Sequence, residues 1–524
     1  MPPTDSPCTR RALLATAVLA LSSLLIPEEL RATTSLAVIA APDSFSARVQ
    51  RGSGVSALRV PLDIRWTAPP DGNVRSYRLQ RRVDGGAWTN VALAEPTKPR
   101  AAMTLDSWRV YGFRVAATDS AGRLGAWSSE HAIRTRQAIQ TEDQAGYSGS
   151  WSRTTSLSFL EGATRRTTEA GASVEFKVSD RGIAWVATQG PGRGRAAVHI
   201  DGTRVATVDL SATTVRYRRV VWTRAWPDPA ERTVKIVVES PASNGVDVDG
   251  LLVVEPPAPD PILVGAGDIA RCGSTSTGDE QTATLLDGIE GTVFTAGDNA
   301  YPDGSIRDFT GCYEPSWGRH RERTRPVPGN HEYATPGAAG YKEYFGSAAV
   351  MNGATWYAYD LGAWRVYALD SECAAIGGCG STSPEGRWLA TDLAHHPRRC
   401  VAAIWHRPRF SSGLERGDVA TAWMWRTLDA SGAELVVSGH DHDYERFSRK
   451  HSDGTAATNG VRQFVVGTGG AVLRPFGSIV ANSVVRWNGS FGVLMLRLRP
   501  AGYSWRFVPV GGSTFQDTGS SPCL

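Results

Sequence analysis

The stretch PPAPDPILVGAGD, residues 256–268, divides this chain into two parts. Its first six residues include four prolines, which predict a stiff, extended linker over residues 256–261. The run ILVGAGD that follows is apolar until it ends at Asp268, as is typical of a buried strand in an α/β sheet. The pattern of apolar residues differs before and after this boundary, so we expect the two parts to differ in fold class.

After the linker, apolar runs alternate with helix-like stretches such as TGDEQTATLLDGIEG (277–291) and SPEGRWLATDLAHH (383–396). This alternation predicts that residues 262–524 form one layered α/β domain.

Before the linker, short apolar runs alternate with turn signals such as Asp84-Gly85-Gly86. The spacing predicts a β-sandwich over residues 42–136, in which the position of Trp66 and the run starting at Tyr111 resemble fibronectin type III modules. A second all-β segment over 145–255 resembles the jelly-roll carbohydrate-binding modules of secreted enzymes. Four tryptophans there are candidates to stack on sugars, although a buried core is their commoner fate: Trp151, Trp185, Trp222 and Trp226.

The amino terminus indicates export. Arg10 and Arg11 precede an apolar run over residues 12–26, which is shorter than the about 20 residues that a membrane-spanning helix needs. We therefore expect a secretory signal over residues 1–41 and a secreted, extracytoplasmic mature protein without a transmembrane segment. Residues 9–14 also resemble a twin-arginine signal, so both export routes stay open.

Composition excludes several classes of protein. A chain of 524 residues corresponds to about three or four domains. Its 41% hydrophobic and 21% charged residues are ordinary for a globular protein and exclude a disordered or fibrous chain. A net charge of +4 is too small for this length to favour a scaffold for nucleic acid or binding to an anionic membrane.

The cysteines predict disulfide bonds. Of the seven, Cys8 would leave with the signal, and the other six all lie after the linker. No CxxC pair is present, which favours disulfides over a zinc site, although six cysteines allow 15 pairings. We expect the pairs Cys272–Cys312, Cys373–Cys379 and Cys400–Cys523, of which closeness in the sequence supports only the second.

The histidines point to where chemistry occurs, because eight of the ten lie after the linker. Five apolar runs in that part end in polar clusters, at Asp268, at Asp298 and Tyr301, at Asn330 and His331, at His406, and at His440 and His442. Ligands bind beyond the carboxyl ends of strands in α/β sheets, so we expect these clusters to meet in one cleft. Their oxygen and imidazole donors suit two adjacent metal ions, a pair that can clamp a phosphoryl group during its transfer.

The series GD (267–268), GDNAY (297–301), GNHE (329–332), WH (405–406) and GHDH (439–442) resembles the calcineurin-like metallophosphoesterases, and Tyr301 points to their purple acid phosphatase type. The resemblance implies a two-sheet β-sandwich core flanked by helices. It further implies a first metal, typically Fe³⁺, on Asp268, Tyr301 and His442, with Asp298 as the bridge. The second metal, typically Fe²⁺, Zn²⁺ or Mn²⁺, would be held by Asn330, His406 and His440.

The resemblance also implies how substrate binds. Asn330 and His331 would contact the phosphate, and His331 would help to protonate the leaving group. Plant members carry a histidine pair shortly after the position of His406, where this chain has no histidine, and Arg407 or Arg409 is a candidate for the missing phosphate contact. Many phosphodiesterases of this superfamily have Asp-x-His at the first motif, but here Ala270 stands in the third position.

These features predict a secreted metallophosphoesterase that hydrolyses phosphomonoesters by attack of a metal-bound hydroxide. A phosphodiesterase or nucleotide-directed hydrolase with the same metals is the alternative enzyme. A non-catalytic protein that binds glycan or cell wall is the alternative outside enzymes, and residues 42–255 are candidates for polysaccharide binding in either case.

Overall fold

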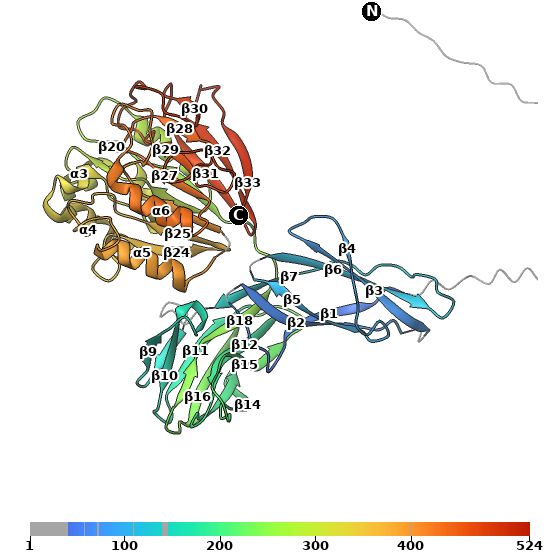
Figure 1. The fold of residues 1–524 in the computed structure, drawn as a ribbon. Helices are drawn as coiled ribbons and strands as arrows, with labels where there is room; N and C mark the ends of the chain where they lie inside the picture. The colour runs from blue at the N-terminus through green and yellow to red at the C-terminus, as the bar shows by residue number, and fades with distance from the viewer. Residues whose placement is uncertain (1–39, 57, 71–72, 108, 139–144, 399) are drawn as a thin grey trace, which may run out of the picture. The chain divides into compact units, whose positions relative to one another are not determined.

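The computed structural model of the protein describes residues 40–524 except 57, 71–72, 108, 139–144 and 399 (Figure 1). The export signal predicted over residues 1–41 lies outside these residues, apart from positions 40 and 41. Among the described residues, no helix is both long and apolar enough to cross a membrane.

The part of the chain before the linker consists of β-strands. Alternating residues in strands such as β1 and β2 are buried, because successive side chains of a strand point to opposite faces. The first strands are β1 (Asp43–Val49), β2 (Arg59–Thr67), β3 (Val74–Val83), β4 (Thr89–Val91), β5 (Arg100–Asp106), β6 (Val110–Asp119) and β7 (His131–Ala138). The next are β8 (Ala145–Ser148), β9 (Ser152–Thr155), β10 (Ala163–Thr167), β11 (Ser173–Val178), β12 (Gly182–Gln189), β13 (Arg195–Ile200), β14 (Thr203–Asp209), β15 (Arg216–Ala225), β16 (Arg232–Ser240), β17 (Val246–Val248) and β18 (Gly250–Glu255), with the short helix η1 (Leu160–Gly162).

The two predicted β modules share one sheet. Strand β7 of the first pairs antiparallel with β18 of the second, within the strand order β15-β12-β18-β7-β6-β3-β4. Across this junction, Arg134 donates to Glu255 over 2.6 Å and Arg136 donates to the same carboxylate over 2.9 Å. The boundaries 42–136 and 145–255 as separate domains stay a prediction, and the observed feature is a continuous sheet between them.

Two of the four tryptophans suggested for sugar stacking are core residues. Trp185 is fully buried and Trp222 is 7% exposed, and both pack in the hydrophobic cluster of the second β segment. Trp151 and Trp226 are partly buried, and the Arg232 guanidinium lies 4.3 Å from the centre of the Trp226 ring. A sugar could therefore stack only on Trp151 or Trp226 of this set.

The part after the linker contains two larger mixed sheets and a two-stranded one, with a helix or loop after most strands. The six-stranded sheet has the order β23 (Thr324–Arg325), β21 (Thr292–Thr295), β19 (Ile262–Ala266), β31 (Gly492–Arg499), β32 (Gly502–Pro509) and β33 (Thr518–Pro522). The seven-stranded sheet has the order β24 (Tyr357–Leu361), β25 (Trp364–Ala368), β26 (Cys400–Ile404), β27 (Leu435–Ser438), β29 (Arg462–Val466), β28 (Tyr444–Phe447) and β30 (Ser483–Trp487). Strands β20 (Ala270–Arg271) and β22 (Ala300–Tyr301) form the small sheet.

The helices of this part are α1 (Gly278–Asp287), α2 (Ile306–Asp308), α3 (Asn330–Tyr333), α4 (Ala339–Phe345), α5 (Pro384–His395) and α6 (Ala422–Ala430). Helical turns of other types are η2 (Phe309–Tyr313), η3 (Trp317–Arg323), η4 (Pro336–Ala338), η5 (Gly346–Ala348) and η6 (Val419–Thr421). Helices α5 and α6 lie against one face of the seven-stranded sheet (Figure 1).

One hydrophobic core lies between the two large sheets. It joins Leu263 and Val293 of the six-stranded sheet to Ile404 and Val437 of the seven-stranded sheet, all of them fully or almost fully buried. A second core packs Trp405 and Val436, from the other face of the seven-stranded sheet, against Leu389 of α5 and Trp425 of α6. The two cores hold the sheets and helices together, and this packing fixes the positions of the carboxyl ends of the strands. The predicted ligands follow these strand ends.

The three expected disulfides are all present. Cys272 is bonded to Cys312, Cys373 to Cys379 and Cys400 to Cys523. The prediction of this pairing is therefore confirmed, including the two pairs that closeness in the sequence did not support.

Candidate metal centre

The predicted ligands come from the carboxyl ends of neighbouring strands. Asp268 follows β19 and Asp298 follows β21, and these two strands are parallel neighbours in the six-stranded sheet. His406 follows β26, while His440 and His442 follow its parallel neighbour β27 in the other sheet. Tyr301 ends β22 and Asn330 begins α3. Parallel neighbours end at the same edge, so each sheet brings its predicted ligands to one edge.

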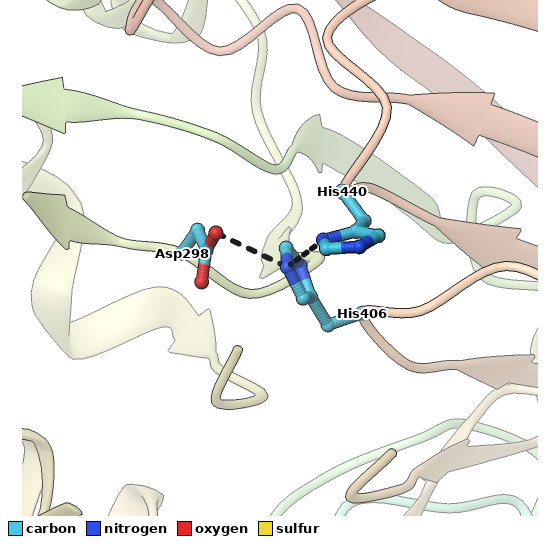
Figure 2. A group of neighbouring side chains, drawn as sticks. All are labelled: Asp298, His406 and His440. Carbon is cyan, nitrogen blue, oxygen red and sulfur yellow. Dashed lines mark hydrogen bonds and ion pairs between the residues drawn. The ribbon is translucent and has the colours of Figure 1, made fainter. Parts of the chain in front are cut away.

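One group of donors gathers around His406 (Figure 2). Its Nε2 lies 3.1 Å from Asp298 Oδ2, 3.1 Å from His440 Nδ1 and 3.1 Å from Asn330 Oδ1. Ligand atoms of Asp298, His406 and His440 all lie within 4.8 Å of one another, close enough to hold one cation. The group therefore contains the three predicted ligands of the second metal, Asn330, His406 and His440. It also contains the predicted bridge, Asp298.

A second group gathers around the Tyr301 hydroxyl. The hydroxyl donates to Asp268 Oδ1 over 2.9 Å and lies 3.1 Å from His442 Nε2. It also lies 3.2 Å from Asp298 Oδ2, the same oxygen that contacts His406. One carboxylate oxygen therefore belongs to both groups, which suits a carboxylate that bridges two metals.

Hydrogen bonds behind the ligands fix their orientation. The Nδ1 atoms of His406 and His442 lie 2.8 Å and 2.6 Å from the carbonyl oxygens of Ala296 and Val472. In each ring this contact assigns a proton to Nδ1 and leaves Nε2 to face the centre, as in metal-binding histidines generally. His440 is turned the other way, with Nδ1 facing the centre.

The backbone at the ligands is unusual. Asp268, Asp298 and His440 have φ values of 60°, 48° and 72°, in the left-handed region that non-glycine residues rarely adopt. Each such residue costs about 1–3 kcal/mol, and strain of this kind persists where the surroundings impose it, commonly at functional sites. A side chain on Gly329 would collide with Asp298 Oδ1 at 2.2 Å, which explains the glycine before Asn330.

Burial and the neighbouring carboxylates shift the pKa values of His406 and Tyr301. Burial opposes a charged imidazole at His406, but the Asp298 carboxylate outweighs burial and raises the pKa of His406 to about 10. Burial and then the carboxylates of Asp268 and Asp298 raise the pKa of Tyr301 well above its ordinary value. Cations in the centre would replace the positive charge on His406. The donor set of carboxylates, phenol, amide and imidazoles fits two cations of the first transition series or zinc.

His331 lies at the opening of the centre. Its Nδ1 contacts the Pro302 carbonyl oxygen, and its ring centre lies 4.2 Å from that of Tyr301. Its Nε2 lies 3.9 Å from Asp298 Oδ2, and a third of the side chain is exposed. The predicted catalytic histidine is therefore next to the donor groups and open to solvent.

Arg407 lies at the rim beside His440. Its Nη1 is 3.1 Å from His440 Nε2, and its Nε and Nη2 donate to the two carboxylate oxygens of Glu372 over 2.7 Å and 3.2 Å. The side chain of Arg407 thus has defined partners at the centre.

Sequence reasoning assigned no role to two glutamates of this site. Glu332 is fully buried and accepts from the backbone N–H groups of Asn299 and Gly329 over 2.8 Å and 2.7 Å, which ties the loop after β21 to the start of α3. Glu372 holds Arg407. A signal for Glu332 was present in the GNHE motif. The signal for Glu372 was a sixth run, WRVYAL (364–369), which is apolar except for Arg365 and is followed by Asp370-Ser371-Glu372.

Comparisons with known proteins agree with part of this picture. Residues 252–444 match the family model for calcineurin-like phosphoesterases, a range that includes all seven predicted ligands, so the chain contains a calcineurin-like phosphoesterase domain. The uncharacterized proteins MT2654 and Rv2577 from two strains of Mycobacterium tuberculosis are each 31% identical over 144 residues, which is 23% of this chain and 27% of theirs. The chain therefore aligns with about a quarter of the length of these curated relatives.

Among solved structures, the purple acid phosphatase PPD1 from yellow lupin (Lupinus luteus) seeds aligns with 90% of this chain and 95% of its own, at 14% identity and a TM-score of 0.41. GAP50, the anchor in the inner membrane complex of Plasmodium, aligns with 51% of this chain and 90% of its own, at 14% identity and a TM-score of 0.41. A family 35 carbohydrate binding module from Clostridium thermocellum aligns with 23% of this chain and 98% of its own, at 8% identity and a TM-score of 0.19.

Proposed function

We propose that this chain, which contains a calcineurin-like phosphoesterase domain, is an exported phosphatase that uses two metal ions to hydrolyse phosphomonoesters. The observation that carries this proposal is the position of Asp298 Oδ2, which lies 3.2 Å from the Tyr301 hydroxyl and 3.1 Å from His406 Nε2. A single oxygen in contact with two ligand groups suits a pair of adjacent cations.

Each group would hold one ion. Asp268, Tyr301 and His442 would bind the first, for which the phenol of Tyr301 favours Fe³⁺, and Asn330, His406 and His440 would bind the second, as Fe²⁺, Zn²⁺ or Mn²⁺. Asp298 would contact both. When bound, such ions supply a nucleophile derived from water at near-neutral pH and stabilise the charge of the phosphoryl group during transfer.

The remaining residues of the site would handle the substrate. His331 Nδ1 faces the Pro302 carbonyl oxygen, so that contact assigns a proton to Nδ1 and leaves Nε2 free to meet the substrate. When the ring is protonated on both nitrogens, Nε2 would pass its proton to the leaving oxygen and return to the Nδ1–H form, a role that suits an imidazole at a solvent-exposed edge. Asn330 and Arg407 would contact the phosphate from the side of the second metal.

The alternative enzyme is a phosphodiesterase or nucleotide-directed hydrolase with the same ligands. Tyr301 in the first group, together with Ala270 where many diesterases have histidine, favours the monoesterase. The test compares turnover of p-nitrophenyl phosphate with that of bis(p-nitrophenyl) phosphate by the metal-loaded protein. We expect faster hydrolysis of the monoester, and a large preference for the diester would contradict the proposal.

Export and glycan binding complete the proposal. Three disulfides in the catalytic part suit an oxidising compartment outside the cytoplasm. Residues 42–255 would bind polysaccharide or cell wall, with Trp151 or Trp226 as the stacking surface. Sedimentation of the full chain with insoluble polysaccharide, with Trp151→Ala and Trp226→Ala as variants, tests this part. Binding that is unchanged in both variants would exclude these rings.

A further inference from the structure

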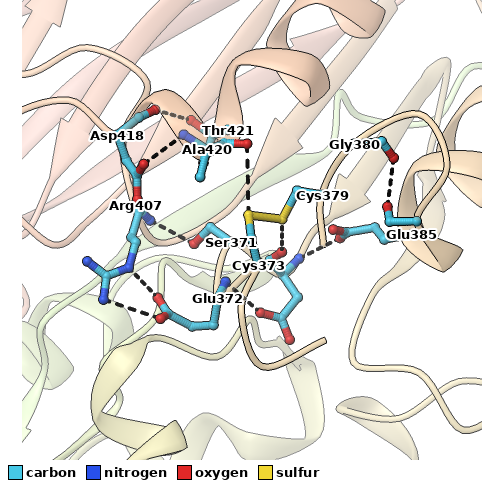
Figure 3. The surroundings of a disulfide bond; sticks show 12 residues. Ser371, Glu372, Cys373, Cys379, Gly380, Glu385, Arg407, Asp418, Ala420 and Thr421 are labelled. Carbon is cyan, nitrogen blue, oxygen red and sulfur yellow. Dashed lines mark hydrogen bonds and ion pairs between the residues drawn. A yellow bond between two sulfur atoms is a disulfide. The ribbon is translucent and has the colours of Figure 1, made fainter. Parts of the chain in front are cut away.

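The loop between β25 and α5 is closed on itself next to the metal centre. Cys373 and Cys379 are six positions apart and disulfide-bonded, with their Cα atoms 5.1 Å apart. Ser371 and Glu372 directly precede the first cysteine and face Arg407 (Figure 3). Because β25 and β26 are parallel neighbours, this loop and Arg407 leave the sheet at the same edge.

Arg407 is held by this loop at both its backbone and its side chain. Its backbone N–H donates to Ser371 Oγ over 2.8 Å, and its guanidinium makes the two-bond contact with Glu372. The side chains of Arg407 and Glu372 are 27% and 11% exposed, so the pair is largely shielded while the guanidinium keeps access to solvent. A paired, planar contact of this kind fixes the direction of the guanidinium as well as its position.

The loop is itself tied to two helices, α3 and α5. Asp370 is fully buried and accepts from the Tyr333 hydroxyl over 2.6 Å, and Tyr333 lies on α3, the helix that begins with Asn330. On its other side, the backbone N–H of Asp370 donates to the buried Glu385 of α5 over 2.8 Å. The Cys379 sulfur lies 3.5 Å from the Asp370 carbonyl oxygen, so the disulfide packs directly behind these contacts.

The remaining guanidinium nitrogen, Arg407 Nη1, contacts His440 Nε2. Binding of a cation by His440 would break this contact. An arginine nitrogen can only donate, so the Nε2 atom of His440 accepts in the contact with Arg407 Nη1. Nδ1 faces the donor group at 3.1 Å from His406 Nε2. If Nδ1 binds a cation, the proton of the neutral ring is on Nε2, which can no longer accept from Arg407.

We propose that the disulfide-closed loop, through Ser371 and Glu372, positions Arg407 to bind the phosphate of the substrate when the metal centre is loaded. This inference rests on the proposed function for the loaded state. Arg407 Nη1 then takes a phosphate oxygen in place of His440, and Glu372 is a positioning residue that acts through Arg407. The ligand class is a tetrahedral phosphate dianion, whose geometry and charge match a guanidinium that presents a free edge.

The charge of Glu372 makes the proposal sharply testable. If Glu372 only neutralises Arg407, removing its charge strengthens the binding of an anion. If Glu372 orients Arg407, removing its charge weakens that binding, although the local charge becomes more positive. The probe is inorganic phosphate, and its dissociation constant is measured by titration calorimetry on the metal-loaded full chain, with metal content checked by elemental analysis.

We expect Glu372→Gln to weaken phosphate binding by about tenfold, the size of one charge-assisted hydrogen bond, with metal content unchanged. Arg407→Gln should weaken it at least as much, and the double variant should be no worse than Arg407→Gln alone. Cys373→Ser with Cys379→Ser should weaken binding in the same direction. The control is Asp287→Asn, which breaks a similar two-bond pair with Arg319, at 2.7 Å and 2.8 Å, between α1 and η3, and should leave phosphate binding unchanged.

The outcomes separate this inference from the proposed function. Unchanged or tighter phosphate binding in Glu372→Gln overturns the inference, whether or not the cysteine variant folds. If the loaded protein hydrolyses no phosphomonoester but its phosphate affinity still depends on Glu372 through Arg407, the inference holds and the proposed function fails. In an active enzyme, we expect KM to rise in Glu372→Gln by more than kcat falls.

Discussion

Asp247 and Asp298 are both buried aspartates of the same chain, but their surroundings differ in kind. Asp247, on β17, accepts from the Thr188 backbone N–H over 3.1 Å and from Arg193 Nη1 over 3.0 Å. Its partners are ordinary donors from nearby strands. Asp298 instead meets Tyr301 and His406, two groups that are themselves metal-ligand types.

The electrostatic consequences are opposite. Burial raises the pKa of Asp247, and its donors do not fully offset that effect. Burial acts in the same direction on Asp298, but His406 and His331 outweigh it and hold the pKa of Asp298 below its usual range. The comparison teaches that burial alone does not distinguish the two carboxylates, whereas contact with several potential ligands does.

The largest expected effect that tests this comparison is that of Asp298→Asn. Replacing the shared carboxylate removes one negative ligand from both proposed ions, so we expect loss of at least one metal and a fall in turnover of at least about a thousandfold. Elemental analysis and hydrolysis of p-nitrophenyl phosphate measure the two effects. A variant that keeps two metals and full turnover would show that Asp298 is no more functional than Asp247.

Asp247→Asn should affect stability alone. The change leaves Arg193 without its buried carboxylate and turns one acceptor into a donor, which should lower the free energy of unfolding of the β-rich part by about 2–4 kcal/mol. Urea unfolding followed by fluorescence measures the loss. Metal content and turnover should remain those of the unmodified protein, and a loss of metal in folded protein would contradict the contrast between the two aspartates.

Tyr301→Phe examines the first ligand group. The variant loses the hydroxyl that contacts Asp268, Asp298 and His442, so we expect metal affinity at that group to fall by about 10- to 100-fold. If the ion is Fe³⁺ bound to phenolate, the visible charge-transfer band of the protein should vanish as well. Tyr313→Phe is the matched control, because Tyr313 is also fully buried but its hydroxyl contacts none of the predicted ligands. A colourless, active parent protein would indicate zinc or manganese instead.

The sequence predicts the candidate ligands because most of them follow an apolar run. The strands β19, β21, β26 and β27 are buried, which gives their sequences a continuous apolar character that ends where the polar ligand begins. The run before Glu372, residues 364–369, is apolar except for Arg365. Its role was missed because serine and glutamate beside a cysteine do not suggest metal binding, and contact with Arg407 depends on how β25 and β26 pair.

The shared sheet of the β-rich part could not be predicted in the same way. Every residue of β18 is buried, and its run LLVV is typical of a central strand with both faces covered. That pattern does not name the neighbouring strand, because β7 is more than a hundred residues away and strand pairing depends on long-range contacts. The pattern therefore indicates a central position for β18 but not the junction with β7.

We expect the smallest effect from substitution of Lys450, which extends the comparison of buried aspartates to a buried lysine. It is fully buried, and its Nζ lies 3.5 Å and 4.0 Å from the ring centres of Phe447 and Phe410. Burial lowers the pKa of Lys450 to about 7. The unfolded chain therefore binds more protons than the folded one between pH 7 and about 10.5, so this group makes the free energy of unfolding rise with pH across that window.

Lys450→Met should remove this pH dependence and stabilise the protein at pH 6 by about 2 kcal/mol, since the aromatic rings already offset part of the cost of the buried charge. Thermal unfolding at pH 6 and pH 9 measures both changes. A variant with the same pH dependence as the parent would place the titrating group elsewhere, and a loss of metal would make Lys450 part of the centre, like Asp298 and unlike Asp247.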